Sequence, residues 1–157
     1  MPDDQDLRPL LVIVDPLEPR RRMVLRAVQA AGLRIEAAAS VDECRAPEAD
    51  TVFFVEHSGC AVAMLAARLA GCRLAIAIIA VLKQPTVESV VAAIIAGAHD
   101  ILAWPATCAE IEAVATSAIT LARIVDRAGP CGPSAMTLVG FAPFAGVAET
   151  GSYRAQA

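Results

Sequence analysis

The chain has 157 residues, of which 57% are hydrophobic and 19% charged, and its formal net charge is −4. This length suits one domain with a short appendage, and so apolar a composition excludes a disordered chain. The negative net charge argues against a surface that coats nucleic acid, and an aromatic content of 4% supplies few stacking platforms for single strands.

Apolar runs and helical stretches alternate along most of the chain. Strands are predicted, in chain order, at Leu10–Val14, Arg34–Ala38, Thr51–Val55, Leu74–Leu82 and Asp100–Ala103. Helices are predicted from Pro19 to Gly32, from the capping box Ser40-x-x-Glu43 to Pro47, from about Cys60 to Gly71, from Thr86 to Gly97, and from the capping box Thr107-x-x-Glu110 to near Arg127. Strands without polar alternation are covered on both faces. We therefore predict an α/β fold, a three-layer, doubly wound, five-stranded parallel sheet of flavodoxin-like type.

The chain divides into three parts. Residues 1–8 form a polar N-terminal arm, residues 9–127 the domain, and residues 128–157 a tail or linker rich in glycine and proline. The apolar residues of the tail follow no obvious period and suit an arm that packs on its own domain or on a second copy. They are Met136, Leu138, Val139, Phe141 and Phe144.

Cysteine usage and the N-terminus indicate a cytoplasmic protein. The five cysteines are widely spaced and form no C-x-x-C pair, which favours reduced thiols that fill the core. The first residues are acidic and polar and so do not form a signal peptide. The long uncharged stretch 128–148 is broken by glycines and prolines, so we expect no association with a membrane.

In an open parallel sheet, ligands bind beyond the carboxyl ends of the strands. The residues at those ends include Asp15, Pro16, Glu56, Trp104 and Pro105. None of the strands is followed by a Gly-rich phosphate cradle of the dinucleotide or P-loop type, so no cofactor is predicted.

The stretches LVIVDPLEPRRRMVL and AGAHDILAWPAT resemble the first strand and helix, and the last strand, of the receiver domain of bacterial response regulators. The resemblance covers roughly residues 9–125. It implies the receiver fold, and in that family an acidic pair holds Mg²⁺, an aspartate accepts a phosphoryl group, and a hydroxyl and a lysine complete the site.

This sequence departs from that site at most positions. Asp15 is present, but its neighbour is Pro16, and Val55 stands at the acceptor position with Glu56 after it. Ala80 stands in the strand end that carries the hydroxyl in the family, and Trp104 takes the place of the lysine before Pro105. Phosphoryl transfer needs a metal and a cation to offset charge on the oxygens. The resemblance therefore implies a degenerate receiver pocket with no catalytic residues, made of Asp15, Pro16, Val55, Glu56, Ala80, Trp104 and Pro105.

Among degenerate receivers, the stretch DECRAPEADTVFFVEHSG and the run from Leu74 to Ile124 most resemble the N-terminal pseudo-receiver of amidase-operon antitermination regulators. That family is controlled by contact with a ligand-binding sensor protein, and a C-terminal helical module binds leader RNA. No such module is visible after Arg127 in this sequence. The resemblance therefore implies docking on a regulatory protein, whereas RNA as a partner has no support in these residues.

Several residues allow a second interpretation. Asp15 is a weak candidate for a Mg²⁺ ligand, but we favour a carboxylate stabilised by helix N-termini and predict no metal site. Glu56 is either a permanent stand-in for phosphate or a solvated loop residue. Trp104 is either an exposed contact residue or packs against the last helix, and a cis Trp104–Pro105 bond would suit the family turn.

Two further groups are predicted to be structural. His57, Ser58 and Cys60 lack the partners that a nucleophile or a zinc site needs, so we predict a loop. The cluster Arg20–Arg22 is expected on a solvated face, because the first helix must bury Met23, Val24, Ala27 and Val28.

We predict a non-enzymatic regulatory domain that acts in signal transduction or transcription regulation by protein–protein contact, as a homodimer or docked on a sensor. The contact surface is predicted on the fourth helix, the last strand and the last helix, with Trp104, Ile101 and Glu110 as its residues. Two alternatives remain: an antitermination regulator that contacts RNA, and a receiver with residual Mg²⁺-dependent phosphoryl chemistry.

Overall fold

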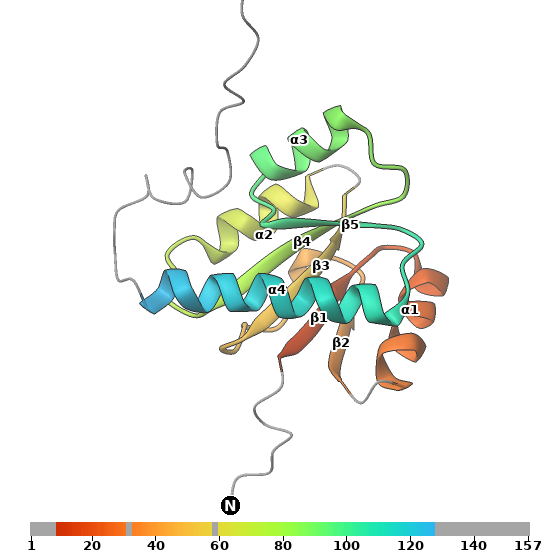
Figure 1. Cartoon of the computed structure of the whole chain (residues 1–157), viewed down its shortest axis with the longest axis horizontal. Coiled ribbons are helices and arrows are strands. Elements are labelled where there is room, and N and C mark those ends of the chain that lie inside the picture. The colour runs from red at the N-terminus through yellow and green to blue at the C-terminus, as the bar shows by residue number, and fades with distance from the viewer. Residues whose placement is uncertain (1–8, 31–32, 58–59, 128–157) are drawn as a thin grey trace, which may run out of the picture.

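The computed structural model describes residues 9–30, 33–57 and 60–127 (Figure 1). The predicted N-terminal arm, 1–8, and the predicted tail, 128–157, lie outside the described residues. Within the described residues, no helix is both long and apolar enough to cross a membrane.

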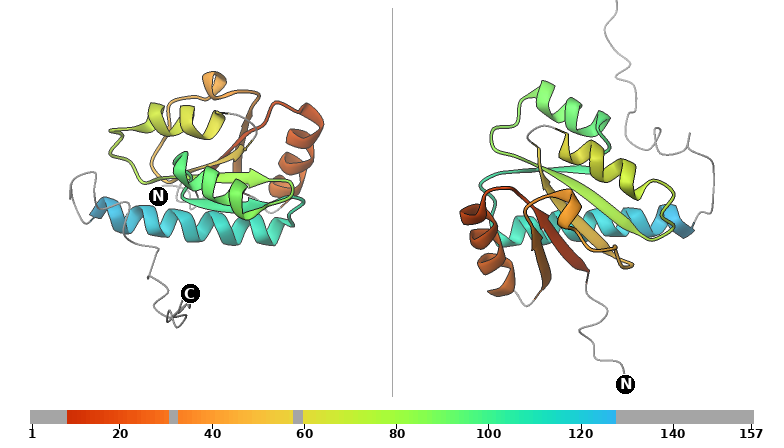
Figure 2. Two further views of the ribbon diagram at one scale, coloured as in Figure 1. Left: turned by 90° about the horizontal axis from the view of Figure 1, so that it is seen from above. Right: turned by 180° about the vertical axis from the view of Figure 1, so that it is seen from behind.

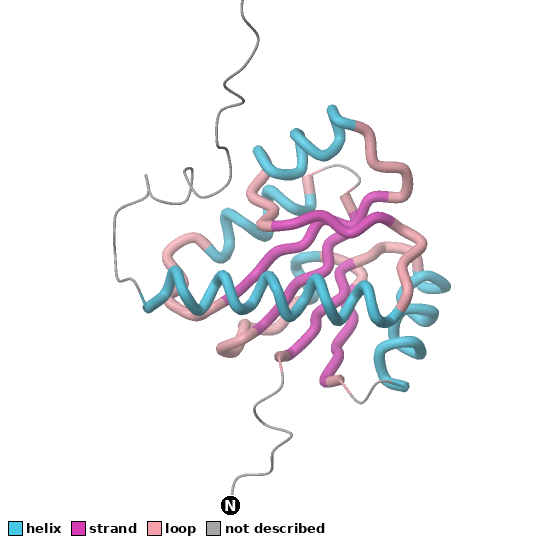
Figure 3. The backbone as a smooth tube through the Cα atoms, in the orientation of Figure 1, coloured by secondary structure: helices cyan, strands magenta, loops and turns pink. Residues whose placement is uncertain are grey.

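The five strands form one parallel sheet in the order β2-β1-β3-β4-β5, and Figure 3 shows them in magenta, with the helices in cyan around them. Their bounds are β1 Leu10–Val14, β2 Arg34–Ala38, β3 Thr51–Glu56, β4 Ile76–Leu82 and β5 Asp100–Ala103. β1 is buried at all of its positions and β3 at all but the last, as expected for strands covered on both faces. The predicted fold class is confirmed.

Helices cover both faces of the sheet (Figure 2). The elements are α1 Glu18–Ala30, the 3-10 turn η2 Val41–Glu43, α2 Ala61–Leu69, α3 Val87–Ile95 and α4 Cys108–Arg127. α1 and α4 pack on one face through Val24, Val28 and Ile111. η2, α2 and α3 pack on the other, where Val62 and Leu65 are fully buried. These are the three layers that the alternating sequence pattern predicts.

The predicted second helix is wrong, because only the three-residue turn η2 forms there. Ser40 makes no capping bond through its side chain, although the carboxylate of Glu43 accepts a hydrogen bond from the Ala39 N–H at 3.0 Å. Only Val41 of the turn is buried. So short a segment with one buried side chain does not offset the cost of helix nucleation, and Pro47 prevents its extension. Instead, Arg68 of α2 donates to the Val41 and Cys44 carbonyls at 2.6 and 3.1 Å.

The predicted ends of α3 and the predicted start of α4 are confirmed, whereas Gly32, the predicted end of the first helix, lies outside the described residues. The Thr86 hydroxyl accepts from the Ser89 N–H at the start of α3, and Thr107 and Glu110 form the predicted capping box at the start of α4. Gly97 ends α3 with φ of +110°, and a Cβ there would lie 2.6 Å from the Cβ of Ala66. This glycine therefore allows both the turn and the close approach of α2.

Two burial predictions are corrected. Cys44 is buried, but Cys60 and Cys72 are exposed and Cys108 is half-buried, because these three lie at helix ends or in a turn; Cys131 lies outside the described residues. Met23 is exposed, because it points away from the sheet while Val24 and Val28 face it.

Candidate functional site

The candidate site lies at the carboxyl edge of the sheet, where β1 and β3 end. Asp15 follows β1 directly, and its carboxylate accepts a hydrogen bond from the Leu17 N–H at 2.8 Å. The Leu17 carbonyl in turn accepts from the Arg20 and Arg21 N–H groups, each at 3.1 Å. Asp15 thus shapes the turn into α1 and places the first turn of this helix beside the strand end.

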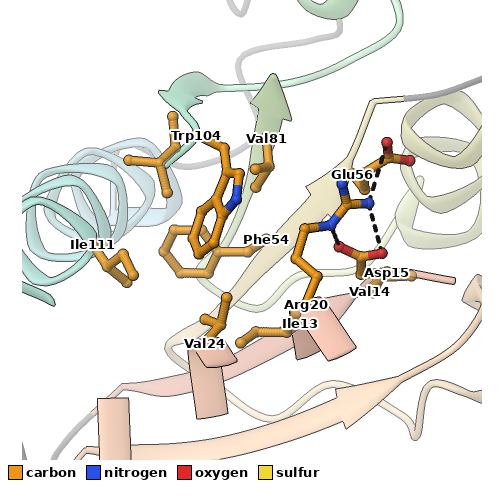
Figure 4. A pocket seen from close by; sticks show the side chains of 11 residues that line it. Ile13, Val14, Asp15, Arg20, Val24, Phe54, Glu56, Val81, Trp104 and Ile111 are labelled. Carbon is orange, nitrogen blue, oxygen red and sulfur yellow. Dashed lines mark hydrogen bonds and ion pairs between the residues drawn. The ribbon is translucent and has the colours of Figure 1, made fainter. Parts of the chain in front are cut away.

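Arg20, in that first turn, joins the two acids of the site (Figure 4). Its Nε donates to Oδ2 of Asp15 and its Nη2 to Oδ1 at 2.7 Å, and Nη2 lies 3.4 Å from Oε1 of Glu56. The side chains of Arg20, Asp15 and Glu56 are 10%, 6% and 13% exposed. The hydrogen bonds to Asp15 raise the pKa of Arg20, so the guanidinium stays charged. We call these three residues the ion cluster.

The predicted solvated position of Arg20 is therefore wrong. Successive residues of a helix point about 100° apart, so three adjacent arginines cannot share one environment. Arg22 is exposed beside Glu18, and Arg21 reaches back to the Asp15 carbonyl. Arg20, the first residue of the triplet, faces the strand end, where it pairs with the carboxylates of Asp15 and Glu56.

An apolar wall closes the site on its other side. Phe54, Val24 and Ile111 line it together with Trp104, whose indole points into the pocket in Figure 4. Trp104 is half-buried, and the Trp104–Pro105 bond is cis. The cavity left between these side chains measures about 20 Å³, which is room for about one water molecule. The pocket is filled by its own side chains.

The structure brings together only some of the predicted pocket residues. Asp15, Glu56 and Trp104 line the pocket. Val55 and Ala80 are register partners within the sheet, and their side chains belong to the core under α2 and α3. Pro16 lines a neighbouring cleft of about 300 Å³, which Glu56 also lines, and Pro105 is exposed.

The other predicted contact residues lie apart from this pocket. Ile101 is half-buried and packs on the core under α2 and α3. Glu110 is exposed, and its carboxylate accepts from the Thr107 N–H at 2.7 Å, which lowers the pKa of Glu110. These residues remain predictions as partner contacts.

Residues 9–30, 33–57 and 60–127 contain no group of three or more His, Cys, Asp and Glu side chains placed to hold a metal ion. The sulfur of Cys60 lies 3.4 Å from that of Met64, and Nδ1 of His57 is buried without a hydrogen-bond partner among the described residues.

A second Asp–Arg pair lies at the opposite, amino edge of the sheet. Arg123 of α4 donates through Nε and Nη2 to the carboxylate of Asp50 at 2.8 and 2.6 Å. Asp50 precedes β3 and has φ of 62°, a left-handed conformation that Asp tolerates better than most residues. The hydrogen bonds from Arg123 lower the pKa of Asp50. This pair, which the sequence analysis missed, fixes the far end of α4 to the sheet.

Groups of three or more exposed, large apolar side chains lie on two helices, α3 and α4. On α3, Val87 and Ile95 are 77% and 81% exposed and Val91 and Ile94 about half exposed, and this helix buries only Ala93. We call these four residues the α3 face. On α4, Leu121, Ile124 and Val125 are about half exposed.

Comparison with solved structures finds the same fold in NtrX and in two receiver domains. NtrX from Brucella abortus is 19% identical over 78% of this chain, with a TM-score of 0.64. A signal receiver domain from Vibrio parahaemolyticus is 13% identical over 78%, with a TM-score of 0.60, and a response regulator receiver domain protein from Clostridium thermocellum 14% over 74%, with 0.55. This chain covers 98% of each of the latter two but 29% of NtrX. The fold is that of a receiver domain.

No family model matches the sequence, and no curated protein matches it.

Proposed function

We propose that this chain is a regulatory domain of signal transduction that acts by protein contact in the cytoplasm, without phosphorylation and without catalysis. The receiver fold supports the signalling role, because solved structures that share it are signalling domains. The observation that carries the proposal is the ion cluster, in which Arg20 binds both acids at the carboxyl edge.

The residues present do not fit Mg²⁺. Mg²⁺ requires carboxylate oxygens in octahedral geometry, usually with several retained waters. Both carboxylate oxygens of Asp15 already accept hydrogen bonds from Arg20, and the same guanidinium lies 3.4 Å from Glu56. A divalent cation there would be repelled by a permanent positive charge in a site of low polarity. Arg20 thus supplies the positive charge that a metal supplies in the receivers that the sequence resembles.

The remaining parts of the pocket also disfavour phosphoryl chemistry. The side chains of Val55 and Ala80 offer neither a nucleophile nor a hydroxyl. Trp104 fills the pocket with an indole, whose one polar group is a donor, and the cavity left beside the indole has room for about one water molecule. In this proposal, the ion cluster holds the domain in one state permanently.

The protein contact is assigned to the α3 face. Val87, Val91 and Ile94 follow the i, i+4, i+7 spacing with which a helix enters an apolar groove. A soluble domain rarely exposes so many large aliphatic side chains on one short helix unless they form an interface. Trp104 points into the pocket, so the α3 face replaces it as the centre of the contact surface.

A pull-down from the protein's own cells tests this proposal. The tagged full chain is cross-linked and recovered with and without RNase, beside the variant Val91→Asp/Ile95→Asp and the control Glu88→Lys on the same helix. A regulatory protein or a second copy that RNase leaves bound, and that the double variant loses, supports the proposal. Recovery of RNA that RNase removes, or equal capture by all variants, would overturn it.

A second experiment tests whether the chain is phosphorylated. Incubation with acetyl phosphate and Mg²⁺ should leave the intact mass of the protein unchanged.

A further inference from the structure

The last two turns of α4 expose large apolar side chains that the earlier turns do not. The exposed residues of α4 before Leu121 are small or polar: Ala109, Glu110, Glu112, Ala113, Thr116, Ser117 and Thr120. Leu121, Ile124 and Val125 are then 56%, 58% and 48% exposed, and we call them the α4 stripe. The exposed side chains of α4 therefore change from small or polar to large and aliphatic within the last seven residues of the helix, which ends at Arg127.

The residues that follow α4 have the composition of a covering segment. From residue 128 to residue 148 there is no charged side chain, and residues 136–144 carry Met136, Leu138 and Val139 with Phe141 and Phe144. Two of the four phenylalanines of the chain therefore lie in this segment. So apolar a run is unsuited to remain in water and requires an apolar surface to cover.

The connection between the stripe and this segment favours a reversal of the chain. Gly129-Pro130 and Gly132-Pro133 follow α4 directly, and Gly-Pro dipeptides are among the strongest turn signals. The eight residues between Arg127 and Met136 can span up to about 26 Å when extended. The stripe begins only about 9 Å from the end of the helix at a rise of 1.5 Å per residue. The segment can therefore return along α4.

We propose that residues 136–144 of this chain dock on the α4 stripe, as an intramolecular cover of the last two turns of α4. A tethered segment meets its site at an effective concentration of millimolar order, so it excludes a second copy or a separate partner at ordinary protein concentrations. The proposal is independent of the proposed function. It leaves the α3 face as the exposed apolar surface for a partner.

Methyl NMR on the full chain tests this docking. Phenylalanine rings over the stripe shift the methyl resonances of Leu121, Ile124 and Val125. We expect Phe141→Ala/Phe144→Ala to abolish these shifts and to leave the methyl groups of Val87 and Ile95 on α3 unchanged. Tyr153→Ala removes an aromatic ring outside the segment and is the matched control, with no expected effect at the stripe. Buried methyl groups such as those of Val52 and Ile79 report that the fold is intact.

Amide hydrogen exchange provides a second readout. The amides of residues 136–144 should exchange more slowly than those of a free chain, and Leu121→Ser/Ile124→Ser should remove that protection, while Thr120→Ser should not. Unchanged stripe methyl resonances in the phenylalanine variant, or equal exchange in both serine variants, would overturn the proposal. Shifts that fade on dilution would also overturn it, because they would assign the contact to a second copy.

Discussion

Two Asp–Arg pairs fix helices to the two ends of one sheet, and their surroundings differ. Asp15–Arg20 at the carboxyl edge is buried, with side chains 6% and 10% exposed, and it shares its guanidinium with Glu56. Asp50–Arg123 at the amino edge is 28% and 42% exposed. Both have two hydrogen bonds between guanidinium and carboxylate. We therefore expect the loss of one partner to cost more stability at the carboxyl edge than at the amino edge.

The desolvation of charge explains this difference. A buried ion pair contributes little net stability, but removal of one partner leaves the other charge buried and unpaired. A pair in contact with water keeps most of its solvation, so its loss costs little. Substitutions at the two pairs should therefore separate these cases.

Arg20→Ala is expected to have the largest effect. It leaves the buried carboxylate of Asp15 without its cation, which should lower the free energy of unfolding by about 3–5 kcal/mol. Alanine has the higher helix propensity, so propensity would act in the opposite direction. Urea unfolding at neutral pH measures the change. Arg22→Ala, which removes an exposed pair two residues away, is the control and should cost about 0.5 kcal/mol or less. Equal losses in both variants would refute the comparison.

The double variant Asp15→Asn/Arg20→Met should recover much of that loss. Asparagine keeps an acceptor for the Leu17 N–H, and methionine keeps much of the volume of the arginine stem without its charge. Replacement of a buried ion pair by neutral groups of similar size is often close to neutral. Glu56 still loses its cation, so recovery should be partial. A free energy of unfolding in urea no higher than that of Arg20→Ala would contradict this expectation. It would mean that the pair itself, and not the unpaired charge, determines stability.

Asp50→Asn should have a smaller effect, about 0.5–1 kcal/mol, because Arg123 and its partner are partly solvated. Asparagine also tolerates the left-handed conformation at this position, so the substitution removes charge without adding backbone strain. Unfolding midpoints at low and high salt measure it. High salt should bring the variant and the wild type closer together. A loss as large as that of Arg20→Ala would contradict the account.

The smallest expected effect is the pH dependence of this last difference. Arg123 lowers the pKa of Asp50 in the folded state, so the pair's contribution is complete above the unfolded value, about 3.9. It is lost as the pH falls through the lower folded pKa. The stability difference between wild type and Asp50→Asn should therefore be constant near neutral pH and shrink in acid. A stability difference between these two proteins that grows as the pH falls would contradict the expected direction of the pKa shift of Asp50.

The fold was predictable because strong local signals agree with the global arrangement. The uninterrupted apolar runs of β1 and β3 mark buried parallel strands, and the box at Thr107 and Glu110 marks the start of α4. The capping signal at Ser40 failed, because it predicts where a helix can begin and not whether enough buried surface follows it.

The candidate site was predictable only in part. The strand ends place Asp15 and Glu56 at the same edge of the sheet, as predicted. Val55 and Ala80 instead point into the core under α2 and α3, and their positions in a motif do not show to which face of the sheet a side chain points. Arg20 was missed because three adjacent arginines resemble a solvated cluster. The signal that could have identified it was the spacing. Asp15 stands at a strand end, five residues before Arg20 in the first turn of the next helix, and this separation allows the two side chains to pair.

The central claim is that Arg20 takes the role of a metal at the carboxyl edge. The most direct test is to record amide NMR spectra of the full chain during titration with Mg²⁺ and then with beryllofluoride, a stand-in for a phosphoryl group. The account predicts no saturable shifts at Asp15, Leu17 and Glu56. Saturable shifts centred on these residues in the wild-type protein would contradict it, because they would show a working metal and phosphoryl site beside the guanidinium.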